Sequence, residues 1–224
     1  MHIESTAIVI HHLQTGPSDA ALSVVAHDVR QSDKGPSLGP GRTFSSTDKL
    51  ALARVLIDDL SASVELLDER CLVVNLETLM WYRPRAKTTL CIAGVDYTVP
   101  LPSLLFLCHR GELHVKAYKG TKRPSADTEL FSAGLPNLYK LGSWCSGGNR
   151  LPEHPGQESI AEIESAFFES PFTHSGNEPL PGNRDEMTGW FKLLQARRSF
   201  PTQALISSNL TMGKWINCVT EVYS

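Results

Sequence analysis

One cysteine stands in a passage whose composition suits acyl-transfer chemistry. Cys145 lies near the end of the segment Arg123–Gly148, which is rich in glycine, serine and proline. Gly142 precedes it by three residues, and Gly147 and Gly148 follow closely. A thiolate attacks thioesters and esters well, and glycines leave room for a bulky acyl group to approach. The passage therefore indicates a nucleophilic cysteine.

Asn137 places an amide at a fixed short distance from this cysteine. It lies eight residues upstream, directly after Pro136. A neutral side-chain amide can stabilise the oxyanion of a tetrahedral intermediate, and losing one such donor typically costs ~10²–10³ in rate. A structural interpretation is equally open, with Cys145 as a small buried residue and Asn137 as a turn residue after proline. Spacing alone does not decide between them.

Two histidines downstream, His154 and His174, suggest a second kind of chemistry. Either imidazole can act as the base of a cysteine hydrolase if it lies within hydrogen-bond reach of the sulfur. His109 and His114 flank a predicted hairpin turn, but no carboxylate or cysteine cluster joins them into a metal-ligand set. No glycine-rich phosphate-binding loop is present, so nucleotide hydrolysis is not indicated. We expect neither a metal nor a cofactor.

The composition is ordinary for a soluble globular protein. The chain has 224 residues, of which 41% are hydrophobic and 20% charged, enough for one domain with a small appendage. A net charge of -3 gives no general reason to expect binding to nucleic acid or to a membrane. The five widely spaced cysteines form no C-x-x-C pair, which argues against a disulfide framework and structural zinc. Without a signal-peptide pattern or a long apolar run, we expect a cytoplasmic protein.

Strand-forming segments make up most of the chain before the cysteine. A hairpin is predicted at the N-terminus. A capped helix follows the Gly/Pro/Ser-rich segment Gln31–Arg42, which we interpret as a loop or a local boundary. The predicted elements are strands at Thr6–Leu13 and Ala20–Val29, a helix at Asp48–Leu60, and strands at Cys71–Tyr82, Thr88–Ala93, Tyr97–Val99, Leu104–His109 and Glu112–Tyr118. Apolar and polar residues alternate in the last strand, which predicts one buried face and one solvent-exposed face. The exposed face would carry His114, Lys116 and Tyr118.

Two amphipathic helices are predicted after the cysteine, at Glu158–Glu169 and Asp185–Arg198. The core stripe of the second consists of Met187, Trp190, Leu193 and Leu194. The segment after Pro201 has mixed periodicity, and no element is assigned to it. This order of elements predicts an α+β domain. We place an extra β-hairpin in residues 1–44 and the main domain in residues 45–224.

The cysteine motif resembles that of the ubiquitin-conjugating enzymes. Pro136-Asn137-Leu138, Gly142 and Cys145 look like the His-Pro-Asn … Gly-x-x-Cys signature of that superfamily. Across Met80–His174 the chain is more closely similar to the B proteins of the bacterial PRTRC system, a prokaryotic branch with plasmid-partition proteins nearby. That closer match rests on Met80–Pro84, Leu101–Phe106, Arg123-Pro124, Pro136–Tyr139 with Gly142 and Cys145, and Phe167-Phe168 through Phe172–His174.

The resemblance implies a UBC-like fold: an N-terminal helix, an antiparallel meander, an active-site flap with the cysteine, and C-terminal helices. It implies that Cys145 accepts a ubiquitin-like protein as a thioester from a ThiF-like activating enzyme and passes it to an amine. Asn137 would hold the flap or stabilise the oxyanion, and Tyr139, Gly142 and His174 are auxiliary candidates. A JAB-type metallopeptidase is a further implied partner.

Two positions depart from the superfamily pattern. Leu135 replaces the histidine of the motif and removes a side chain that usually braces the flap. Ser146 and the two glycines after it follow the cysteine where an apolar residue is usual. A catalytically inactive module that keeps the fold and binds a ubiquitin-like partner is therefore one alternative. A cysteine hydrolase that uses His154 or His174 is another.

Overall fold

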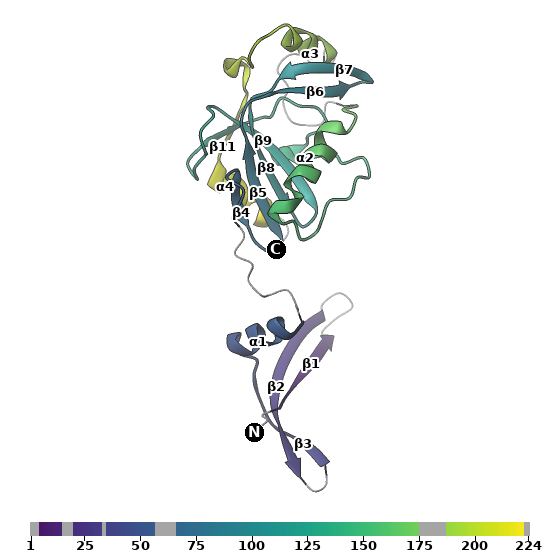
Figure 1. The fold of residues 1–224 in the computed structure, drawn as a ribbon, viewed down its shortest axis with the longest axis vertical. Helices are drawn as coiled ribbons and strands as arrows, with labels where there is room; N and C mark the ends of the chain where they lie inside the picture. The colour runs from purple at the N-terminus through teal and green to yellow at the C-terminus, as the bar shows by residue number, and fades with distance from the viewer. Residues whose placement is uncertain (1–4, 15–19, 33–34, 57–65, 175–186, 222–224) are drawn as a thin grey trace. The chain divides into compact units, whose positions relative to one another are not determined.

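A computed structural model describes residues 5–14, 20–32, 35–56, 66–174 and 187–221 of the chain (Figure 1). The chain divides into two compact units, residues 1–65 and residues 66–224, and each is described by itself. The division after residue 65 lies beyond the domain boundary predicted after residue 44, which remains a prediction.

The first unit contains a three-stranded antiparallel sheet in the order β1-β2-β3. Its strands are β1 (Thr6–Gln14), β2 (Ala20–Ser32) and β3 (Gly35–Thr43). The predicted N-terminal hairpin is confirmed, whereas the loop predicted at Gln31–Arg42 is wrong, because β3 pairs with β2 over most of that segment. β3 is an edge strand, where prolines are tolerated, and a bulge between His27 and Val29 takes up the irregular register.

A capped helix, α1 (Ser46–Leu56), follows this sheet. The Oγ of Ser45 accepts a hydrogen bond from the backbone N–H of Asp48 (3.2 Å), and the Asp48 carboxylate accepts one from the backbone N–H of Ser45 (2.8 Å). Hydrogen bonds from the Arg42 guanidinium, and then from Ser45, hold the pKa of Asp48 well below its usual range. The predicted helix start is confirmed, and its predicted end at Leu60 lies outside the described residues.

The second unit is built on a six-stranded antiparallel sheet in the order β11-β10-β9-β8-β5-β4, with a separate β6-β7 hairpin. The strands are β4 (Cys71–Val74), β5 (Thr78–Arg83), β6 (Lys87–Ile92), β7 (Val95–Pro100), β8 (Ser103–His109), β9 (Glu112–Tyr118), β10 (Glu129–Phe131) and β11 (Ser207–Thr211). The single strand predicted at Cys71–Tyr82 is two strands. Asn75 makes the turn between them, because its side-chain oxygen accepts a hydrogen bond from the N–H of Glu77 (3.0 Å).

Three helices are described in this unit, α2 (Ile160–Glu169), α3 (Met187–Gln195) and α4 (Met212–Glu221). The helix predicted at Glu158–Glu169 is confirmed, although its first turn is a 3₁₀ turn. In α3 the predicted core residue Leu193 is 64% exposed, and Phe191 is buried instead, 6.4 Å from the Tyr97 ring. The unassigned segment after Pro201 forms β11 and α4. The mixture of antiparallel sheets and helices is α+β, as predicted.

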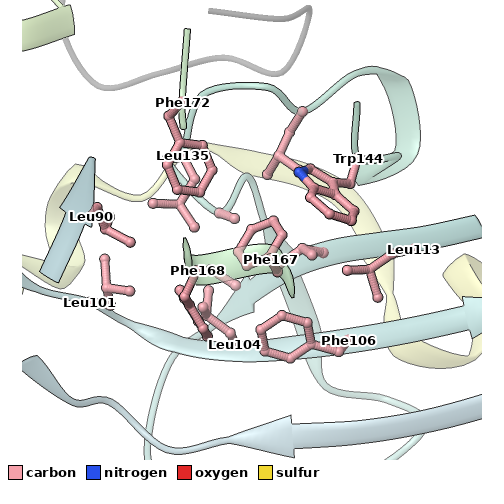
Figure 2. Close-up of a cluster of buried hydrophobic side chains, with 14 of the residues drawn as sticks. Leu90, Leu101, Leu104, Phe106, Leu113, Leu135, Trp144, Phe167, Phe168 and Phe172 are labelled. Atoms are coloured by element: carbon pink, nitrogen blue, oxygen red, sulfur yellow. The ribbon is translucent and has the colours of Figure 1, made fainter. Parts of the chain in front are cut away.

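The larger core cluster lies between α2 and the main sheet (Figure 2). Phe106 of β8 stacks on Trp81 at 5.0 Å and meets Phe167 of α2 edge-on at 5.6 Å. Trp144, the residue before the candidate nucleophile, meets Phe167 at 5.6 Å as well. Glu164 adds a polar link, because it accepts a hydrogen bond from the Trp81 indole N–H (2.9 Å). The cysteine is therefore attached to the core through its neighbour.

The opposite face of the sheet is covered too, which contradicts the wet face predicted for β9. His114, Lys116 and Tyr118 are each at most 3% exposed. Tyr118 belongs to a second apolar cluster with Leu105 and with Trp215 of α4. Period-two alternation identifies the two faces of a strand, but it does not show whether a helix far along the chain covers the second one.

Candidate active site

The candidate nucleophile lies on a short antiparallel turn, residues 137–145, which we call the cysteine loop. Leu138 and Trp144 form an antiparallel bridge, the N–H of Tyr139 donates to the Ser143 carbonyl, and the N–H of Cys145 donates to the Asn137 carbonyl, both at 2.8 Å. Side chains alternate along such a pair. Leu138 and Trp144 are buried, whereas Tyr139 is 37% exposed and Cys145 is a half-buried free thiol. The hydroxyl and the thiol therefore share the outer side of the loop.

Gly142 allows the tip of this loop to approach β9. Its φ is +81°, and a Cβ at this position would lie 2.2 Å from the carbonyl oxygen of Val115. Leu141 also has a positive φ of +61°, and its carbonyl accepts a hydrogen bond from the indole N–H of Trp215 in α4 (2.8 Å). The Gly142 position therefore has a physical requirement for glycine, and the tip is held by both the sheet and a helix.

Asn137 ties the loop to the segment that follows α2. Its side-chain oxygen accepts hydrogen bonds from the backbone N–H groups of Thr173 (3.0 Å) and His174 (3.1 Å). Its side-chain N–H donates to the Pro171 carbonyl (3.0 Å), and its backbone N–H donates to the His174 carbonyl (2.8 Å). The residue is 4% exposed and has a φ of +57°, a region that asparagine tolerates better than most residues. Its amide braces two chain segments.

This brace places His174 beside Tyr139. The Tyr139 hydroxyl and the His174 Nε2 are 3.0 Å apart, and the Thr173 hydroxyl lies 3.3 Å from the Nδ1 of the same ring. The rings of Tyr139 and His174 are 5.7 Å apart between centroids. The hydrogen bond that Tyr139 shares with the Cys145 side chain raises the pKa of the Tyr139 hydroxyl above its ordinary value. A connected series of polar groups therefore runs from the thiol to the imidazole and on to a hydroxyl.

The two departures from the superfamily motif have local explanations. Leu135 is fully buried and packs in the larger core cluster, where Figure 2 shows it close to Phe172. After the cysteine, the side-chain N–H groups of Asn149 donate to the Ser146 carbonyl and to the Ser170 hydroxyl, both at 2.9 Å. This second asparagine connects the segment directly after the cysteine loop to the end of α2. Two asparagine side chains therefore anchor the passage.

The other candidate residues lie elsewhere. The Nδ1 of His154 is 3.0 Å from the Leu76 carbonyl in the turn between β4 and β5, and the Nδ1 of His109 is 2.9 Å from the Thr78 hydroxyl. In the described part of the chain, no group of three or more His, Cys, Asp and Glu residues could hold a metal ion. None of the helices described here is long and apolar enough to cross a membrane.

Few of the residues that complete this cluster can be recognised from the sequence. Pro171 and Thr173 act through backbone groups, more than 30 residues from Asn137 in the chain. Asn149 belongs to no recognisable motif. The one available signal was that Phe172–His174 directly follows a predicted helix, which is also where the histidine candidate lies.

A family model described as Prok-E2_D, prokaryotic E2 family D, matches residues 50–208. E2 is the general term for ubiquitin-conjugating enzymes and their relatives. No curated protein and no solved structure matches the chain. The matched range includes the whole cysteine loop, the segment after α2 and His174.

Proposed function

The chain belongs to the prokaryotic E2 family D, and from that premise we propose that Cys145 carries the C-terminus of a ubiquitin-like protein as a thioester. Membership of an E2 family suggests a ubiquitin-conjugating-like role with a ubiquitin-like protein and its activating enzyme as partners. In the proposed reaction a ThiF-like enzyme spends ATP to activate the modifier, and Cys145 takes over the acyl group. A JAB-type metallopeptidase would later remove the modifier from its targets.

The observation that carries this proposal is the setting of the thiol. Cys145 is a half-buried free cysteine on the outer side of a hydrogen-bonded loop, whereas Cys71 and Cys108 are buried in strands. Burial raises the pKa of both strand thiols, that of Cys108 to about 12, which keeps them protonated and unreactive at neutral pH. The carrier role therefore falls to Cys145 among these three, and its accessibility favours the carrier over an inactive binding module.

We assign Asn137 the role of holding the loop. Its side-chain oxygen accepts two backbone N–H groups and its side-chain nitrogen donates to a carbonyl, so the amide is fixed in the direction of the segment after α2. Of the two roles expected from the motif, flap holding and oxyanion stabilisation, these contacts support the first.

A loading assay tests the proposal. The protein is incubated with its activating enzyme, ATP and the ubiquitin-like protein encoded beside it, and the products are separated without reductant. We expect an adduct that dithiothreitol removes, that disappears in Cys145→Ala and that persists as a reductant-resistant oxyester in Cys145→Ser. Cys218→Ala, which removes a half-buried thiol on α4, is the matched control and should load normally. An adduct that survives in Cys145→Ala would contradict the assignment.

A further inference from the structure

The polar groups beside Cys145 form a pathway along which a proton can move. We propose that Tyr139 and His174 are a proton relay that accepts the thiol proton of Cys145 when the acyl group is loaded. This inference rests on the proposed role of Cys145 as the nucleophile. Tyr139 is a catalytic residue in this scheme because it touches the reacting thiol, and His174 acts through Tyr139.

The architecture of the cysteine loop carries the argument. In the antiparallel pairing, residue 137 is opposite residue 145 and residue 139 is opposite residue 143. Tyr139 and Cys145 are thus diagonal neighbours on the outer side, a separation that an aromatic side chain spans. The Tyr139 hydroxyl reaches 3.0 Å from the Nε2 of His174. The hydroxyl–imidazole separation is short enough for a hydrogen bond. The diagonal placement brings the Cys145 thiol to the same phenol, which therefore lies between the sulfur and the imidazole.

The position of His174 is determined by more than this one contact. The side-chain oxygen of Asn137 accepts hydrogen bonds from the backbone N–H groups of Thr173 and His174. The backbone N–H of Asn137 donates to the His174 carbonyl. The Thr173 hydroxyl approaches the second ring nitrogen at 3.3 Å. A residue that orients the far side of an imidazole is what a general base requires to present the correct nitrogen to its partner. The brace by Asn137 therefore has a functional consequence beyond loop stability.

The proton transfer balances without any further reactant. The S–H bond of Cys145 breaks and its proton passes to the Tyr139 oxygen, while the Tyr139 O–H proton passes to the Nε2 of His174. The products are a thiolate, an intact phenol and an imidazolium. The thiolate attacks the modifier thioester, the activating enzyme's sulfur leaves as a thiolate, and the imidazolium proton returns through the phenol or solvent to that leaving group. The neighbouring thiol keeps the pKa of Tyr139 high, so the phenol transmits a proton without remaining ionised.

The relay differs from catalysis by an imidazole that contacts the thiol directly. It also differs from a mechanism in which a carboxylate orients the imidazole. The Tyr139–His174 pair lies beside one further ionisable group of the cysteine loop, the Cys145 thiol. Neither Tyr139 nor His174 forms an ion pair with a described carboxylate, and His154 is engaged at the β4–β5 turn. Hydroxide can replace such a relay at high pH, which makes the pH profile the diagnostic observable.

The test uses the whole 224-residue chain and does not depend on a partner. The rate of alkylation of Cys145 by iodoacetamide is followed by mass spectrometry between pH 6 and pH 10, with Cys218 in the same sample as an internal reference. We expect Tyr139→Phe and His174→Gln to slow alkylation at pH 7 by at least about tenfold, in keeping with general-base contributions. Their rates should converge with the wild type as pH rises. The double variant should be no slower than either single variant, because both remove the same pathway.

Three results would overturn the relay. These are wild-type rates in both single variants at pH 7, a slowing that is equal at every pH, and multiplicative effects in the double variant. His154→Gln, which changes a histidine outside the cluster, should leave the pH profile of alkylation unchanged.

The loading assay, run on the same variants, separates the two proposals. If the wild type does not load but the alkylation profile is as expected, the relay stands and the carrier function fails. If the wild type loads and the variants load equally fast at all pH values, the relay fails alone.

Discussion

Single residues decide how closely the cysteine loop approaches the sheet, and Gly142 is the clearest case. A methyl group there would sit 2.2 Å from the Val115 carbonyl oxygen, and the positive φ adds strain for any L side chain. We expect Gly142→Ala to lower the free energy of unfolding by about 2–4 kcal/mol, measured by chemical denaturation. Gly147→Ala is the matched control, since its φ is +61° with nothing within 4 Å of the added Cβ, and it should cost only about 1 kcal/mol. Equal losses would mean that the contact with Val115 is unimportant.

Asn137 combines a strained backbone with three side-chain hydrogen bonds, and two substitutions separate the contributions. Asn137→Ala leaves the N–H groups of Thr173 and His174 and the Pro171 carbonyl without this partner and should cost about 2–4 kcal/mol. Asn137→Gly removes the same bonds but tolerates the φ of +57°. If the hydrogen bonds dominate, both variants lose similar stability in thermal or chemical denaturation. Full recovery in the glycine variant would show that the side-chain bonds contribute little.

The candidate residues around the cysteine could be proposed from the sequence. The contacts that each side chain makes, and therefore the role of each residue, could not. The order Asn137, Gly142, Cys145 and a motif resemblance pointed to one loop, and the structure brings Tyr139 and His174 to it as well. The direction in which the Asn137 amide points depends on a backbone segment more than 30 residues later. No local pattern contains that information, because the partners are carbonyl and N–H groups that every residue has.

At the scale of elements, the packing of the cysteine loop on β9 introduces a pH dependence. His114 of β9 is 3% exposed, and its backbone pairs with Ser143 in the loop. Burial lowers the pKa of His114 from 6.5 to about 4, although Glu112, 4.0 Å from its Nε2, opposes the shift. His109 and Lys116 act in the same direction as burial. The histidine is thus kept neutral in the folded protein.

Acid should therefore destabilise this part of the fold. Between pH 6.5 and pH 4 the unfolded state binds more protons at this position, so the free energy of unfolding falls as pH decreases through that window and is retained above it. The loss is at most about 3.5 kcal/mol, since one pKa unit corresponds to about 1.4 kcal/mol. Urea denaturation at several pH values should show the slope, and His114→Leu should flatten it. An unchanged slope in His114→Leu, with exposed His154→Gln as the control, would contradict this account.

Helices and strands whose hydrophobic residues recur with a regular spacing could be predicted from the sequence. Strands that depend on pairing with a distant segment could not. The ends of strands β8 and β9 and of helix α2 lie close to those that their hydrophobic patterns predict, although both faces of β9 are buried. β3 was hidden by its glycines and prolines, because its edge position relaxes the usual requirements. β11 is five residues of mixed polarity that form a strand by pairing with β10, more than 70 residues earlier in the chain. The extended conformation of β11 is stabilised by its hydrogen bonds to β10, which the local sequence does not reveal.

At the scale of the whole molecule, the candidate site and both apolar clusters belong to one unit. Every residue of the two clusters lies at Cys71 or later. The cysteine loop contacts β9, α2, α4 and the segment after α2, all in the same unit. The family match begins earlier, at residue 50, within α1. Two starting points are therefore defined for the functional domain, one at residue 66 from compactness and one at residue 45 from the sequence pattern.

Two truncated proteins distinguish these boundaries. Because its clusters are complete, the fragment 66–224 should unfold cooperatively, with a melting temperature within about 4 °C of the main transition of the full chain, equivalent to about 1 kcal/mol for a unit of this size. Its Cys145 should also keep the alkylation rate of the full chain. The fragment 45–224 retains α1 and should match it in both measurements. A fragment 66–224 that melts much lower than 45–224 would show instead that α1 stabilises the main domain, which is the arrangement that the UBC-like pattern predicts.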